Sequence, residues 1–124
     1  MTLAYWCVLI AAFMPIGFAG ISKAGGERYN NTRPREWLAR QSGWRQRANW
    51  AQQNSVEAFA PFAAAVIIAH QLDAGQTAVN ALAVSFIGFR VAYGACYIGD
   101  RPTLRSLVWL GGFACVIALF FLAA

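Results

Sequence analysis

Residues 54–62, NSVEAFAPF, place one carboxylate, that of Glu57, inside an otherwise apolar run. A second apolar run contains residues 90–97, RVAYGACY, and places the guanidinium of Arg90 in a similar setting. An ionisable side chain within a membrane-spanning segment is costly, and it usually marks a functional site with a nearby partner. The two stretches therefore predict a pair of facing membrane helices that hold a polar site between them.

Composition supports this class of protein. Hydrophobic residues make up 59% of the 124 residues and charged residues only 12%, whereas about a quarter of the residues in a soluble domain are charged. Seven of the ten Lys and Arg residues fall between Lys23 and Arg47, and such clusters are typical of the cytoplasmic side of a membrane. The interleaved tryptophans and tyrosine suit a headgroup interface, so binding of nucleic acid is not expected.

The hydropathy pattern predicts an all-α integral membrane protein, a bundle of four transmembrane helices forming a single domain over 1–124. The helices are expected over about 3–21, 47–72, 77–98 and 103–122, since about 20 residues cross the hydrocarbon core. The polar loop 22–46 and the turn 99–105 would then share one side of the membrane. By the positive-inside rule that side is cytoplasmic, with both termini on the outer side.

Glu57 and Arg90 are expected at equal depth. Each lies about 12 Å inside its helix end, at a rise of about 1.5 Å per residue. Because a buried charge needs a partner, a direct Glu57–Arg90 ion pair is the simplest prediction.

Helical spacing extends this pair into a stripe of polar residues on each helix. Gly94 lies on the same side of its helix and would allow close approach of a neighbour. The two stripes predict a polar wedge that opens toward the cytoplasm, near free N–H groups at the start of the last helix. Its members are Arg47, Asn54, Glu57 and Pro61 on one helix, Arg90, Tyr93 and Tyr97 on the next, and Arg105 at the rim.

The same residues also fit a structural role, in which the Glu–Arg pair fixes helix register and the tyrosines sit at the membrane interface. His70 is expected near the outer end, and Trp109 is expected to be a packing residue. The three cysteines lie far apart in apolar runs, so neither a disulfide nor a metal site is expected.

The series Asn54-x-x-Glu57-x-x-x-Pro61-Phe62, Arg90-x-x-Tyr93-x-x-x-Tyr97 and Pro102-x-x-Arg105-Ser106 resembles the MAPEG family. These are membrane-associated proteins in eicosanoid and glutathione metabolism. The order and spacing agree over nearly the whole chain, and the resemblance is closest to the short bacterial branch. The resemblance implies a homotrimer in a bacterial inner (plasma) membrane.

The resemblance implies a glutathione transferase or peroxidase that would act on lipophilic electrophiles or hydroperoxides, with glutathione as co-substrate. Arg105 would be the catalytic residue that stabilises the glutathione thiolate. The glutathione-binding positions would be Asn54, Glu57, Arg90, Tyr93, Tyr97, Ser106 and Arg47. Lipids, a lipophilic small molecule and further copies of the chain would be the partners.

Two alternatives remain at this stage. Gln53 stands where many family enzymes have arginine, and Tyr93 stands where many have a basic residue or histidine. These changes favour a non-catalytic membrane protein of the same scaffold that binds a lipid or a partner. The third reading is a small four-span exporter with Glu57 as its membrane carboxylate, although such exporters usually carry that group in their first helix.

Overall fold

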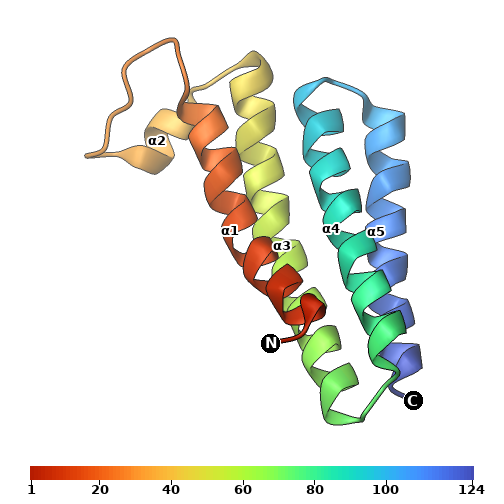
Figure 1. Ribbon diagram of the computed structural model, residues 1–124. Coiled ribbons are helices and arrows are strands. Elements are labelled where there is room, and N and C mark those ends of the chain that lie inside the picture. Colours follow the sequence, from red (N-terminus) through yellow and green to blue (C-terminus); the bar gives the residue numbers. More distant parts are fainter.

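The computed structural model describes all residues, 1–124, and consists only of helices and their connections (Figure 1). The long helices alternate in direction, so both termini and the α3–α4 turn lie at one end of the molecule. The α2 segment and the α4–α5 turn lie at the opposite end, called here the loop end. The helices are α1 (Leu3–Lys23), α2 (Pro34–Ala39), α3 (Gly43–Gln71), α4 (Gln76–Ile98) and α5 (Pro102–Leu122).

Three helices, α1, α4 and α5, are long and apolar enough to cross a membrane. The prediction of an integral membrane protein is therefore supported, with three candidate membrane-spanning helices among the four that were expected. Helix α3 has 29 residues but is not among the three. Polar residues along α3 lower its hydropathy, among them Asn54 and Glu57 on the stripe that defined the predicted site.

The segment predicted as a loop over 22–46 differs from that expectation, because it contains α2 and the first turn of α3. Pro34 begins α2 and Glu36 lies in its first turn, and both residue types are favoured at a helix N-terminus. Trp37 of α2 is fully buried, and its Nε1 donates to the carbonyl oxygen of Arg28 at 3.0 Å. The segment 22–46 is thus folded around the buried side chain of Trp37.

The core is formed where α3 meets α1, α4 and α5. Alanines line the buried face of α3, and their small side chains let neighbouring backbones approach closely. Phe62 of α3 stacks on Phe86 of α4 with ring centroids 3.9 Å apart. Gly94 of α4 is buried beneath the ring of Phe18 from α1, which fills the space that a side chain at position 94 would need. This contact is the close approach that the glycine predicted.

The end that carries the termini is closed by polar contacts. His70 of α3 hydrogen-bonds through Nε2 to the hydroxyl of Thr2 at 2.8 Å, and its ring stacks on Tyr5 with centroids 4.1 Å apart. The backbone N–H of Ala4 donates to the side-chain oxygen of Asn80 at the start of α4. Because α1 and α4 both begin at this end, α3 has to run from the loop end back to this end along the full length of the bundle.

Candidate functional site

The two predicted charges lie level but do not touch. Arg90 donates from Nη2 to Oδ1 of Asn54 at 2.9 Å, and Asn54 donates from Nδ2 to Oε2 of Glu57 at 3.1 Å. The direct Glu57–Arg90 ion pair expected from the sequence is therefore wrong. Asn54 lies one turn from Glu57 on the same helix, and its amide both accepts and donates, so it occupies the position between the charges.

Arg90 is the buried member of this group, with 3% of its surface exposed. Its guanidinium lies over the ring of Tyr93, 4.4 Å from the centroid, and Nη2 also donates to the hydroxyl of Ser55 at 3.4 Å. Sequence reasoning missed Ser55. Its hydroxyl bonds the carbonyl of Ala51 one turn earlier, and a hydroxyl beside a predicted site residue in an apolar run was the available signal.

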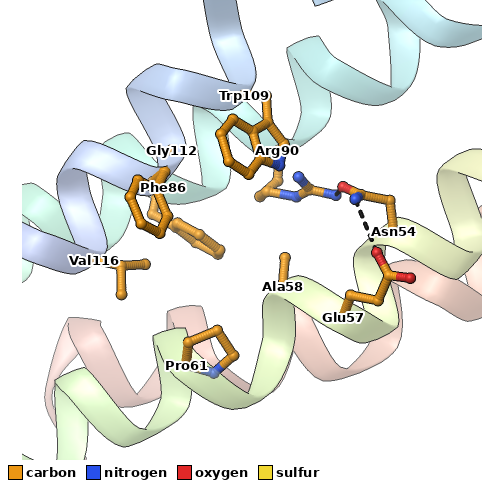
Figure 2. A pocket seen from close by; sticks show the side chains of 10 residues that line it. Asn54, Glu57, Ala58, Pro61, Phe86, Arg90, Trp109, Gly112 and Val116 are labelled. Atoms are coloured by element: carbon orange, nitrogen blue, oxygen red, sulfur yellow. Dashed lines mark hydrogen bonds between the residues drawn. The ribbon is translucent and has the colours of Figure 1, made fainter. Parts of the chain in front are cut away.

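Glu57 differs from the expectation of a buried carboxylate, because its side chain is exposed at the surface of the chain. Figure 2 shows it on α3 beside Asn54, with the Asn54–Glu57 hydrogen bond drawn as a dashed line. An exposed carboxylate on a helix packed among membrane spans is unfavourable against lipid. This face of α3 therefore calls for a covering group, whether a ligand or another chain.

Asn54 and Glu57 form a wall between two clefts. The polar cleft lies between α3 and α4, has a volume of about 300 Å³, and is lined further by Trp50, Gln53, Tyr93 and Tyr97. The apolar cleft also reaches α5 and has a volume of about 200 Å³. It is lined further by Ala58, Pro61, Phe86, Arg90, Trp109, Gly112, Phe113 and Val116. Arg90 therefore lines the apolar cleft while Tyr93 and Tyr97 line the polar one, although its guanidinium still lies over the Tyr93 ring.

Tyr97 links the polar cleft to the start of α5. The guanidinium carbon of Arg105 lies over the Tyr97 ring, 4.4 Å from its centroid. Tyr93 meets the same ring edge-on at 5.6 Å, and Trp50 lies 6.0 Å away. A cation over an aromatic face is held in place without losing its charge. Arg105 is therefore positioned at the edge of the polar cleft as a cation with no carboxylate partner.

Two predicted residues are engaged elsewhere. Arg47 donates from Nε to the carbonyl oxygen of Ile98 at 3.0 Å, so it satisfies an unpaired carbonyl at the end of α4. Ser106 donates its hydroxyl to the carbonyl oxygen of Pro102 at 3.1 Å and is exposed on α5. No hydrogen bond joins either residue to Asn54, Glu57 or Arg90.

Trp109 is also placed differently from the prediction of a packing residue. Its side chain is 40% exposed, stacks on Phe113 with centroids 5.4 Å apart, and lines the apolar cleft. It lies one helical turn beyond Arg105 on α5, so the two share a face of the helix. On α5 the lining of the apolar cleft therefore begins one turn deeper in the bundle than Arg105, which lies at the edge of the polar cleft.

The loop end is strongly basic. The only ion pair in the structure joins Arg33 and Glu36, at 3.5 Å and well exposed. Arg101 and Arg105, at the α4–α5 turn, have no acidic partner. The polar cleft thus combines the exposed carboxylate of Glu57 with one cation at its edge, Arg105, which suits a ligand that carries both an amino group and an anionic group.

Comparison with known proteins identifies the chain at the level of a family. A family model described as the MAPEG family matches residues 3–124, nearly the whole chain. No curated protein and no solved structure matches.

Proposed function

Because the chain belongs to the MAPEG family, we propose that it binds glutathione in the polar cleft and activates its thiol. The thiolate would attack a lipophilic electrophile, or reduce a lipid hydroperoxide, that arrives from the bilayer. Arg105 is the catalytic residue of this proposal, and Glu57 binds the glutathione amino group. Asn54, Tyr93 and Tyr97 complete the binding surface, whereas Arg47 and Ser106 are not among the residues that line the cleft.

The observation that carries the proposal is the position of Arg105. Its guanidinium lies against Tyr97 at the edge of the polar cleft and has no carboxylate partner. A thiol is a nucleophile only as the thiolate, and a neighbouring cation lowers its pKa. An unpaired arginine at the edge of a cleft that also holds a carboxylate is suited to a ligand with both a thiol and an amino group.

Glu57 recognises the amino group of glutathione in this proposal. Asn54 holds only Oε2 of the carboxylate, so Oε1 makes no hydrogen bond within the chain. An ammonium group bound there would form a charge-assisted hydrogen bond, which is stronger than a neutral one. Arg90 is a positioning residue in this proposal. Its hydrogen bond to Asn54 fixes the orientation of the amide that donates to Glu57.

The membrane arrangement belongs to the same proposal. If α1 and α4 both cross, then α3 crosses as well, because it connects the loop end of α1 to the start of α4 at the other end. The bundle then has four spans, with the basic loop end in the cytoplasm of a bacterial inner membrane and both termini outside. Neighbouring copies in a homotrimer would cover the exposed face of α3 that carries Glu57.

Glutathione binding to the purified protein in detergent, measured by calorimetry, tests the recognition part. The variant Glu57→Gln keeps the shape of the side chain and removes its charge. Its affinity should fall by about ten-fold or more, because hydrogen bonds to charged groups contribute about 1.5–3 kcal/mol. Glu27→Gln is the control, since Glu27 is exposed in the loop and makes no ion pair. Equal affinity in the two variants would overturn the role of Glu57.

A non-catalytic scaffold protein is the second candidate, and one observation favours it. Gln53 and Tyr93 both line the polar cleft, and neither carries positive charge. The cleft interior therefore attracts carboxylates less than a cleft with arginine or histidine at these positions. Glutathione binding without transfer to any of several electrophiles would support this second function over the first.

A further inference from the structure

The guanidinium of Arg45 is held in place where the end of α1 meets the start of α3. These two segments lie side by side at the loop end (Figure 1), and Nε of Arg45 donates to the carbonyl oxygen of Ala24 at 3.0 Å. The guanidinium carbon lies over the ring of Trp44, 4.5 Å from its centroid. A cation over an aromatic face keeps its charge, so the two contacts fix the group without neutralising it.

Two glycines pack against the same guanidinium. Gly25 and Gly26 both have a left-handed backbone, with φ of +65° and +69°, a conformation that favours glycine. A methyl group at position 26 would lie 2.7 Å from Cζ of Arg45 and 2.8 Å from its Nη2, and one at position 25 would lie 3.0 Å from Nη2. The chain therefore turns closely around Arg45, in a space that a larger residue would fill.

The Nη1 and Nη2 nitrogens of Arg45 are available to an anion. The single hydrogen bond of the side chain uses Nε, and no carboxylate forms an ion pair with it. The backbone N–H groups of Gly25 and Gly26 also have no backbone acceptor. A guanidinium presents parallel N–H groups that match the oxygens of a phosphate. The segment thus combines a fixed cation with unused donors.

The depth of Arg45 indicates which phosphate it meets. Helix α1 is long and apolar enough to cross a membrane and ends at Lys23, next to Ala24, so the group lies level with the lipid headgroups. Trp44 is 38% exposed beside it, as is typical of a tryptophan at a membrane interface. Lys23 adds a second cation without a carboxylate partner, and its Nζ lies 4.3 Å from the centroid of the Tyr29 ring.

From these observations we propose that Arg45, together with Gly25 and Gly26, binds the phosphate of an anionic phospholipid. The cytoplasmic leaflet, which the basic loop end faces, carries anionic lipids that attract basic segments. Two unpaired cations favour a headgroup with net negative charge, such as that of phosphatidylglycerol, over the zwitterionic headgroup of phosphatidylcholine.

This site goes beyond the proposed thiol chemistry and does not depend on it. Neither Arg45 nor the two glycines line the polar cleft or the apolar cleft. Lipid binding is measured without glutathione, and glutathione binding can be measured without the lipid. Failure of one proposal therefore leaves the other open to its own test.

Native mass spectrometry of the full protein in a neutral detergent measures binding of the first lipid. Phosphatidylglycerol should bind more tightly than phosphatidylcholine with the same acyl chains. Arg45→Gln should lower the affinity for phosphatidylglycerol by about ten-fold, the loss expected when hydrogen bonds to a charged group are removed. Arg40→Gln, which removes an exposed arginine of the loop end, is the control and should change the affinity little. Equal losses in the two variants, or equal affinity for the two lipids, would overturn the site.

A matched pair of glycine variants separates the contact with Arg45 from backbone strain. Gly26→Ala places a methyl group against the end of a flexible side chain, so Arg45 is displaced and the affinity for phosphatidylglycerol should fall several-fold. Gly43→Ala introduces the same left-handed strain, at φ +61°, where nothing lies within 4 Å of the added methyl, and should leave the affinity unchanged. Equal affinities in the two variants would contradict the role of the glycines.

Competition with inorganic phosphate distinguishes the lipid from a soluble anion. Phosphate at the concentration of the lipid should not displace phosphatidylglycerol, because the acyl chains also cover exposed apolar residues at the end of α1, such as Ile21. Displacement by phosphate at that concentration would assign the site to a soluble anion and overturn the lipid proposal.

Discussion

The Nη2 nitrogen of Arg90 lies 2.9 Å from Oδ1 of Asn54, and this hydrogen bond joins α4 to α3 at the wall between the two clefts. Because the Asn54 oxygen accepts from Arg90, its amide nitrogen is turned toward Glu57. One side chain therefore fixes the orientation of a carboxylate and the position of a buried cation.

Replacing Asn54 by alanine should lower both stability and glutathione affinity. Arg90 would keep only its longer hydrogen bond to Ser55, and an unsatisfied buried donor costs about 1–3 kcal/mol. Thermal unfolding in detergent would measure the loss of stability. The variant Gln71→Ala, at the exposed end of α3, is the control and should leave the unfolding temperature unchanged. Equal unfolding temperatures for the two variants would exclude the bridging role of Asn54.

Gly94→Ala should destabilise the bundle by about 1–3 kcal/mol, the usual cost of overpacking a core. The added methyl would collide with the ring of Phe18, so α1 would have to move away from α4. Gly88→Ala should be neutral or slightly stabilising, because its methyl meets no atom and alanine is the better helix former. Unfolding curves of the two variants measured side by side would check this, and a neutral Gly94→Ala would contradict the observed contact.

Trp37→Ala should release the folded loop at the loop end. The change removes the hydrogen bond to Arg28 and the edge-on contact with Tyr29, whose ring centroid lies 5.2 Å away. Limited trypsin digestion should then cleave the loop arginines faster, while the membrane helices stay intact. Leu38→Ala, at the half-buried neighbouring position, serves as the control. Cleavage of Trp37→Ala at the parental rate would show that the loop is held by other contacts.

His70→Ala should weaken the terminal end and leave glutathione binding unchanged. The variant loses the hydrogen bond to Thr2 and the stacking on Tyr5, and one hydrogen bond contributes about 0.5–1.5 kcal/mol to stability. Hydrogen exchange at the first turn of α1 should become faster. A loss of glutathione affinity in this variant would contradict the placement of the thiol site at the opposite end of the bundle.

The four long helices could be predicted from the sequence because long, largely apolar runs are separated by polar segments. The short helix α2 could not be predicted, since its stability depends on the burial of Trp37 against a loop whose course the sequence does not specify. The equal depth of Glu57 and Arg90 could be predicted from the rise of a helix. The prediction of a direct contact was wrong, because the amide of Asn54 lies on the same turn as Glu57 and hydrogen-bonds to both charged groups.

The division of the site into two clefts could not be predicted either. Helical stripes group residues on one helix, and they do not show which neighbouring helix each member meets. Arg90 and Tyr97 share a stripe on α4, yet Arg90 faces the apolar cleft and Tyr97 the polar one. The family resemblance, in contrast, is confirmed over residues 3–124, because spaced motifs on three helices are specific when taken together.

Ultraviolet absorbance of glutathione bound to the purified protein tests the central claim most directly, since the thiolate absorbs where the thiol does not. The parent protein and Arg101→Ala, which removes an exposed arginine at the same turn, should both show the thiolate band at neutral pH. Arg105→Ala should bind glutathione and lose the band, together with any transfer activity. A thiolate band of equal strength in Arg105→Ala would contradict the assignment of Arg105 as the activating cation.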